Sequence, residues 1–232
     1  MIRHLQREIE AIKRKLLGLC AIVEKNVVMA TKAIAEQDEA LAQTVIAEDE
    51  RIDRMEVELE EDCLKILALY QPVAVDLRAI VAVLKINNDL ERIGDLTVNV
   101  AERAHYLAAR PALPKPFDFD LMADKVRAML TKAVDAFVEG QSHAAHEVCK
   151  ADDEVDAINR AMYKSVEAML GEPDADVNTL IHLLSVSRDL ERIADHATNI
   201  AEDVIYMISG EIVRHHVEDY TKNSPSSHET ME

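Results

Sequence analysis

Apolar residues recur every three or four positions along most of the chain, which is the spacing of one face of an amphipathic α-helix. The clearest stripe, near the amino terminus, consists of Leu5, Ile9, Ile12, Leu16, Leu19, Val23, Val27, Ala30 and Ile34. Polar, glycine or proline breaks then divide the pattern into further helices. These are expected from about 40 to 70, 72 to 109, 120 to 139, 142 to 170 and 174 to 209. The pattern predicts an all-α protein of six helices.

Proline and polar residues indicate how these helices are grouped. Pro72 suits the first turn of the third helix. Three of the six prolines lie between 110 and 116, which is typical of a linker. The expected organisation is a first three-helix repeat at 1–110, a Pro-rich linker at 111–117, a second three-helix repeat at 118–216 and a disordered tail at 217–232.

An internal repeat supports this division. Residues 89–95, DLERIGD, recur as DLERIAD at 189–195, an offset of 100. Upstream, the segment 49–53 resembles 152–156 at an offset of 103. Matches in the same order at nearly one offset indicate a tandem duplication of a three-helix bundle, with pseudo-twofold symmetry as the resulting architecture.

Composition narrows the class of protein. The chain has 232 residues, with only 5 Gly, 3% aromatic residues and no Trp, which disfavours a β-sandwich or barrel. A formal charge of −18 repels nucleic acid and anionic lipid, so both are poor partners for the bulk surface. The three cysteines are an odd number and far apart, which favours a reducing cytoplasm. The longest uncharged apolar run, 79–84, is too short to span a membrane.

Oxygen-bearing side chains follow one face of several helices. At 100° per residue, Asp95 and Asn99 lie within about 80° of Glu91, away from the apolar face. The second helix has a comparable stripe that continues to Glu56 and Glu60. The candidate metal-ligating residues are Asp49, Asp53, Glu91, Asp95 and Asn99 in the first repeat, and Asp152, Asp156, Glu191, Asp195 and Asn199 in the second.

Clustered carboxylates with Asn carbonyls suit a hard cation such as Mg²⁺, Mn²⁺ or iron. The alternative interpretation is an ordinary solvated face of an acidic helical protein. Against it, like charges at i, i+4 cost roughly 0.2–0.5 kcal/mol each, and the spacing occurs four times. Because a duplication would also copy a structural pattern, metal binding stays a hypothesis from the residues alone.

The repeated segments resemble the signature repeats of the PhoU family, regulators associated with the phosphate-specific ABC transporter. The resemblance covers the chain from its first helix to about 216. The family's E(D)xxxD pattern is met four times, by Glu91/Asp95, Glu191/Asp195, Asp49/Asp53 and Asp152/Asp156. The resemblance implies two three-helix bundles whose acidic stripes form two surface sites for metal clusters of iron or of other metals (Mn, Mg or Zn).

The same resemblance implies a function. The protein would be a cytoplasmic negative regulator of phosphate uptake and of the phosphate-starvation response, and not an enzyme. Its partners would be the ATPase subunit of the phosphate ABC transporter, a phosphate-sensing histidine kinase and a second copy in a homodimer. Contact with the membrane would come through protein partners only.

Two alternatives stay open. A ferritin-type iron-storage or oxidase protein would place its carboxylates inside a helical bundle and use Glu-x-x-His, which the repeated motif lacks. A helical scaffold would bind no metal at all. The two halves also differ. Leu96 stands where the second half has His196, so the two sites need not be equivalent. Gly94 stands where the second half has Ala194, which favours a closer helix approach in the first half.

Overall fold

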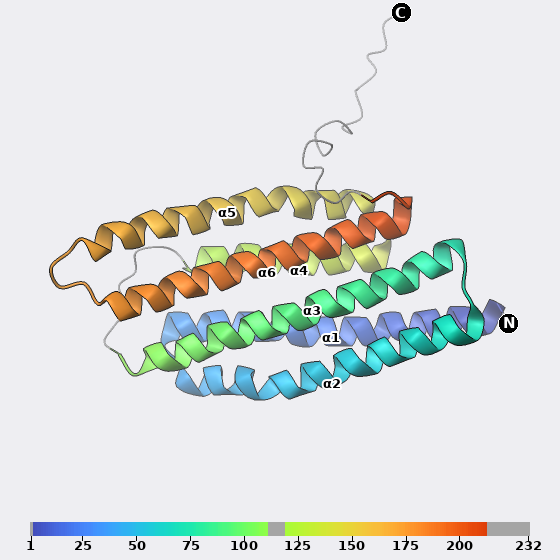
Figure 1. The fold of residues 1–232 in the computed structure, drawn as a ribbon, viewed down its shortest axis with the longest axis horizontal. Helices are drawn as coiled ribbons and strands as arrows, with labels where there is room; N and C mark the ends of the chain where they lie inside the picture. Colours follow the sequence, from blue (N-terminus) through green and yellow to red (C-terminus); the bar gives the residue numbers. More distant parts are fainter. Residues whose placement is uncertain (1, 111–118, 213–232) are drawn as a thin grey trace, which may run out of the picture.

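The structure is a computed structural model that describes residues 2–110 and 119–212. In these residues it has six α-helices and no strand, as predicted (Figure 1). The helices are α1 (Ile2–Glu36), α2 (Glu39–Tyr70), α3 (Ala74–Ala108), α4 (Phe119–Glu139), α5 (Ser142–Leu170) and α6 (Val177–Ser209). The expected Pro-rich linker and disordered tail lie outside the described residues. No helix in the described part of the chain is long and apolar enough to cross a membrane.

The helices form two three-helix bundles that lie side by side. α1, α2 and α3 pack on one another, as do α4, α5 and α6. The bundles meet where α3 packs along α6 and α1 along α4 (Figure 1). This arrangement confirms the prediction of a duplicated three-helix bundle.

The apolar stripes of the sequence form the core. In α1 the predicted stripe is buried from Ile9 to Ile34, while Leu5 is partly exposed at the start of the helix. α3 and α6 bury a wider face than the other helices, because each packs against its own bundle and against the other bundle. Burial of a leucine or isoleucine side chain contributes about 1.5–3 kcal/mol, so these stripes are the main source of stability.

The connection between α2 and α3 differs from the prediction. α2 ends at Tyr70, and Gln71 adopts a left-handed conformation (φ 47°) in which its N–H caps the Leu67 carbonyl. α3 begins only at Ala74. Pro72 therefore lies in the turn and not in the first turn of the helix, because the left-handed cap changes the chain direction before the proline.

Gly94 permits a close approach between α2 and α3. A Cβ atom at this position would lie 3.3 Å from Ile52 Cγ2 and 3.4 Å from Ile52 Cδ1. At the equivalent positions of the second repeat, Ala194 faces the same way and Val155 replaces the isoleucine. One repeat thus combines glycine with the larger side chain, and the other combines alanine with the smaller one.

This exchange leads to a prediction about stability. Gly94→Ala gains helix propensity but crowds Ile52, so the two effects nearly cancel. Ile52→Val alone is expected to cost about 0.5–1.5 kcal/mol. The free energy of unfolding of the double variant should exceed, by about 1 kcal/mol, the value expected if the effects of the two single substitutions were additive. Urea unfolding of the four proteins measures this coupling, and strict additivity would contradict the packing argument.

Candidate functional site

Carboxylates of α2 and α3 come together on the outer side of the first bundle. Burial raises the pKa of Asp49, and the nearby charges of Asp53 and of Asp95 on α3 raise it further. The pKa of Glu91 is raised by burial and by Asp95, and also by Glu56 and Asp53 on α2. The stripes of the two helices therefore face each other. We call these five residues the first acidic cluster.

The second bundle repeats the arrangement between α5 and α6. Burial raises the pKa of Asp152 to about 6, and the charges of Asp195, Asp156, Asp153 and Glu191 contribute. The pKa values of Glu191 and Asp195 are also raised, by burial first and then by neighbouring carboxylates. Asp152, Asp156, Glu191 and Asp195 form the second acidic cluster.

The clusters lie at the surface but are partly enclosed by the helices. The Glu91 side chain is 23% exposed, and the next inward-facing residues of α3, Leu90 and Ile93, are fully buried in the core. Within the described residues, Asp49 Oδ1 and Glu91 Oε2 are buried oxygens without a hydrogen-bond partner. A desolvated, unsatisfied carboxylate oxygen is costly, and a cation would satisfy it.

An arginine competes for the same carboxylates in the first cluster. Arg92 Nε lies 3.3 Å from Glu91 Oε2, outside hydrogen-bond geometry, and Arg92 Nη1 lies 3.5 Å from Asp95 Oδ2. Over the ranges that the structure describes, no three carboxylate, imidazole or thiol groups converge closely enough to hold a metal ion. The donor chemistry fits a hard cation, but binding would require the side chains to draw together.

The structure gives one predicted ligand, Asn199, a partner on the other bundle. Asn199 lies at the junction of α3 and α6, where its side-chain amide donates to Asp89 Oδ1 at 3.5 Å. The backbone carbonyl of Asn99 accepts a hydrogen bond from Arg103. Asn199 contributes to the contact between the bundles, because its position on α6 is at the edge of the stripe that faces α3.

Glu56 joins the first cluster without being among the ten candidate ligands. Its pKa is raised by burial and then by Glu60 and Asp53. Glu56 was predictable from the sequence, because acidic residues follow one face of α2 at spacings of four, three and four from Asp49 to Glu60. By the offset of 103, Asn159 and Tyr163 replace Glu56 and Glu60 in the second repeat, so the first cluster has more carboxylates.

Charged residues at the junction break the symmetry of the duplication. Arg103 Nη1 on α3 lies 3.0 Å from Asp189 Oδ2 on α6. At the offset of 100, Asp203 corresponds to Arg103 and Asp89 corresponds to Asp189. An exact copy of the ion pair would therefore place two carboxylates, Asp203 and Asp89, opposite each other. Instead Lys85 Nζ lies 2.6 Å from Asp203 Oδ1.

Asp89, the other of these two carboxylates, also has a partner on the opposite bundle. His196 Nδ1 lies 2.8 Å from Asp89 Oδ1, across the junction of the two bundles. His196 follows Asp195 of the second acidic cluster in the chain, whereas its counterpart Leu96 is buried. The second cluster is thus linked to the first bundle. The pairs formed by these two carboxylates were not predictable from the sequence, because their members are more than 100 positions apart in the chain.

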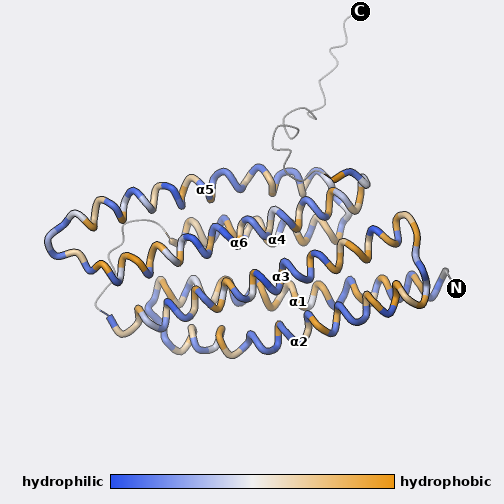
Figure 2. Tube along the Cα trace, in the orientation of Figure 1, coloured by the Kyte–Doolittle hydropathy of each residue, from blue (hydrophilic) through white to orange (hydrophobic). Residues whose placement is uncertain are grey.

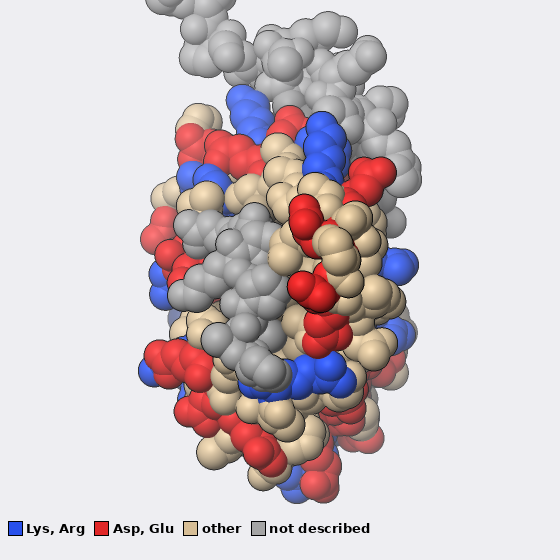
Figure 3. Space-filling view, turned by 90° about the vertical axis from the view of Figure 1, so that its left-hand side faces the viewer, with Lys and Arg blue, Asp and Glu red and all other residues tan. Residues whose placement is uncertain are grey.

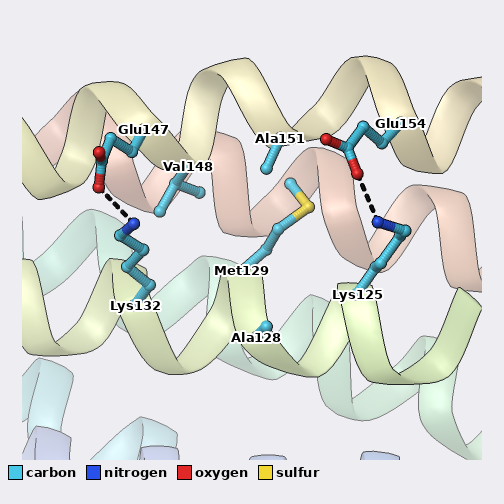
Figure 4. A pocket seen from close by; sticks show the side chains of 8 residues that line it. All are labelled: Lys125, Ala128, Met129, Lys132, Glu147, Val148, Ala151 and Glu154. Carbon is cyan, nitrogen blue, oxygen red and sulfur yellow. Dashed lines mark hydrogen bonds and ion pairs between the residues drawn. The ribbon is translucent and has the colours of Figure 1, made fainter. Parts of the chain in front are cut away.

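Two of the hollows in the described part of the molecule lie outside the acidic clusters and are lined by charged residues of both signs. One of about 480 Å³ lies at the junction of α3 and α6, beside Lys85, Asp89 and Asn199. The other, of about 220 Å³, lies between α4 and α5 and has an apolar floor that includes Met129 and Val148 (Figure 4). Two ion pairs between these helices, Lys125–Glu154 and Lys132–Glu147, stand at its ends. Because its charges are paired with one another, this second hollow does not resemble a metal site.

The raised pKa of Asp152 predicts a dependence of stability on pH. The unfolded chain releases this proton near the ordinary value of 3.8, and the folded protein near 6. Between these values the folded state binds more protons, so stability falls as pH rises through this window. Asp152→Asn should stabilise the metal-free protein at neutral pH by about 1 kcal/mol, a value reduced for partial exposure.

Urea unfolding of the metal-free variant and of the wild type, below and above this window, measures the effect. The exposed Asp120 supplies a control, and Asp120→Asn should leave the pH dependence unchanged. Equal pH profiles for wild type and Asp152→Asn would contradict the assignment of this carboxyl group.

Comparison with known proteins matches both bundles. A family model described as the PhoU domain matches residues 16–104 and 119–204. The phosphate-specific transport system accessory protein PhoU homolog of Clostridium acetobutylicum is 35% identical over 209 residues, which cover 90% of this chain and 95% of that protein. The protein of the same description from Aquifex aeolicus is 38% identical over 209 residues, 90% of this chain and 95% of the relative.

Solved structures agree with the sequence relatives. The crystal structure of PhoU from Pseudomonas aeruginosa superposes with a TM-score of 0.85 at 37% identity, covering 89% of this chain and 99% of that one. The phosphate transport system regulatory protein PhoU from Streptococcus pneumoniae gives a TM-score of 0.81 at 26% identity, covering 90% and 99%. The similarity therefore extends over both bundles and their relative placement.

Proposed function

Because the chain belongs to the PhoU family, we propose that it is a negative regulator of phosphate uptake and of the phosphate-starvation response. It acts in the cytoplasm as a non-catalytic adaptor, and as a homodimer. Its partners are the ATPase subunit of the phosphate ABC transporter and a phosphate-sensing histidine kinase. The family match over both bundles carries the proposal, and the relatives' names, accessory and regulatory proteins of phosphate transport, support the transport role.

We further propose that each acidic cluster holds a hard divalent or trivalent cation. In the first, Asp49, Asp53, Glu91 and Asp95 are the ligating residues. The unsatisfied oxygens and mutually raised pKa values support this assignment. A bound cation would neutralise clustered negative charge. It would act as a switch only through a difference in affinity between two states of the protein or of its complexes.

The position of the carboxylates disfavours the ferritin-type alternative. In such proteins the ligands project into the centre of the bundle. Here the centre is filled by apolar residues such as Leu90 and Ile93, and the carboxylates lie on the outer side of α2 and α3. A cation at this position would be accessible to a partner protein, as a signalling role requires.

The test is alkaline phosphatase activity in phosphate-replete cells that lack the gene. Deletion is expected to derepress the enzyme several-fold, and the wild-type chain to restore repression. A chain with isosteric neutral replacements at four cluster positions is expected not to restore it: Glu91→Gln, Asp95→Asn, Glu191→Gln and Asp195→Asn. A control chain loses the same number of charges at exposed positions: Glu8→Gln, Asp120→Asn, Glu139→Gln and Glu167→Gln.

Each outcome has a separate meaning. If deletion changes nothing, the regulatory function is wrong for this chain. If the cluster variant represses as well as the control, the regulator stands and the clusters are solvated surface, as the scaffold alternative states. Circular dichroism and immunoblotting establish that both variants accumulate folded, since loss of the protein would imitate loss of function.

A further inference from the structure

Large apolar side chains are exposed at the turn between α2 and α3. Leu69, Val73 and Val75 are 76%, 74% and 62% exposed, and Leu77 is 39% exposed. We call these four residues the apolar tip. They project from one end of the bundle, where Figure 2 shows hydrophobic residues at the start of α3. Several large exposed apolar side chains gathered at one turn indicate an interaction site.

The turn holds these side chains in a defined arrangement. Gln71 and Ala74 both have positive φ values, 47° and 50°, on either side of the buried Pro72. Residues without a glycine's freedom adopt this conformation only where the surrounding structure enforces it. The backbone of the turn is therefore held in one conformation, which fixes the direction of the exposed side chains of the apolar tip.

Basic side chains surround the apolar tip. The start of α1 lies beside the turn (Figure 1), and Gln6 Nε2 donates to Asp76 Oδ1 at 3.0 Å. Arg3 and Arg7 are exposed on this part of α1, about 40° apart around the helix. Arg78, one turn into α3, donates from Nε to the Met207 carbonyl. We call Arg3, Arg7 and Arg78 the basic collar.

The nearest acidic residues of α2 do not cancel this charge. Asp62 is paired with Lys15 at 2.5 Å, and both Glu61 and Asp62 are paired with Lys65. On α1, Glu10 is paired with Lys13 and lies beyond Arg7 from the tip. Two further carboxylates, Glu8 and Asp76, lie among these arginines, so three positive charges face two negative ones at this end of a chain whose formal charge is −18.

We propose that the apolar tip and the basic collar form a docking surface for an anionic lipid bilayer. Apolar side chains that project from a rigid turn enter the interfacial region, and arginines beside them attract anionic headgroups. The strongly acidic remainder of the molecule is repelled by the anionic lipid, so the protein would bind with the apolar tip facing the bilayer and the rest of the molecule directed away from it. The proposal revises the expectation of membrane contact through protein partners only, and it does not depend on the proposed regulatory function.

The opposite end of the molecule supplies a matched control. The turn between α5 and α6 also exposes apolar residues, Val177 at 49% and Ile181 at 53%. The connecting segment 171–176 carries Glu172 and Asp174 and no basic residue, and Figure 3 shows Asp and Glu side chains together with Lys and Arg side chains over this end. If apolar exposure alone caused binding, both ends would bind lipid equally.

The test is co-sedimentation of the full chain with phosphatidylcholine vesicles that contain no phosphatidylglycerol or about one-third of it. Binding is expected with the anionic vesicles and is expected to weaken with salt. Val73→Asp with Val75→Asp, and separately Arg3→Glu with Arg7→Glu, should each reduce binding about tenfold or more. Val177→Asp with Ile181→Asp should leave it unchanged.

A spectroscopic measurement locates the contact. The chain has no Trp, so Leu69→Trp introduces a single reporter, whose emission should shift to the blue only with anionic vesicles. Absence of wild-type binding, or equal loss in the control variant, would overturn the proposal. So would a lipid-free dimer, seen by analytical ultracentrifugation, that Val73→Asp with Val75→Asp dissociates while vesicles are not bound. The tip would then be a surface for a second copy.

Discussion

Lys85→Ala is expected to destabilise the protein by about 3 kcal/mol. Lys85 Nζ lies 2.6 Å from Asp203 Oδ1, and the Asp203 side chain is only 4% exposed. Removal of the lysine would take away the cation that lies 2.6 Å from this buried carboxylate. Water that enters from the hollow beside Lys85 would restore only part of the hydration of a side chain that is 4% exposed.

Urea unfolding at neutral pH measures the loss, and a second lysine provides the control. Lys15 forms a comparable pair with Asp62 at 2.5 Å, but the two side chains are 47% and 32% exposed and both belong to the first bundle. Lys15→Ala is expected to cost less than about 1 kcal/mol. Addition of Asp203→Asn to Lys85→Ala should recover part of the loss. Equal effects of the two lysine variants would show that burial of Asp203 is not decisive.

A saturating hard cation such as Mn²⁺ is expected to raise the thermal unfolding midpoint substantially. At a concentration of about one hundred times Kd, one site adds about 2.7 kcal/mol to the stability of the folded state. For a chain of this size that corresponds to roughly 5–10 °C per site. The effect follows from the relief of carboxylate repulsion in the two acidic clusters, which the raised pKa values of Asp49 and Asp152 report.

Variants that lack the carboxylates of one cluster show how much of the increase in unfolding temperature comes from each bundle. The first set is Asp49→Asn, Asp53→Asn, Glu91→Gln and Asp95→Asn. The second set is Asp152→Asn, Asp156→Asn, Glu191→Gln and Asp195→Asn. Each set should remove about half of the shift while raising metal-free stability, since it removes repulsion as well as ligands.

The control for this experiment is the chain with neutral replacements at Glu8, Asp120, Glu139 and Glu167, which should keep the whole shift. A shift that is lost equally in the control would indicate nonspecific screening of an acidic protein. No shift at all, with Mg²⁺, Mn²⁺ or Fe³⁺, would reject metal binding at the clusters.

The candidate site was predictable to the extent that it is local. Glu91 and Asp95 lie one helical turn apart, and so do Asp49 and Asp53, so the sequence alone places each pair on one face. That the two pairs meet depends on how α2 packs on α3, and the close approach of Ile52 to Gly94 is part of that packing. The location of Asn199 at the junction was not predictable, because it depends on the rotation of α6 against α3.

The sequence by itself determined the six helices, the duplication and the family. Helical periodicity is a property of neighbouring residues, and a repeat at a fixed offset can be read directly along the chain. Only the tertiary structure decided which charges meet across the duplication. Copying a repeat would set Asp89 against Asp203, and the chain avoids this with Lys85 and His196 from opposite bundles. The same holds for the apolar tip, whose basic collar comes from residues some 70 positions apart. Local spacing determines a helix and its faces, but the partner of a face depends on packing between distant segments.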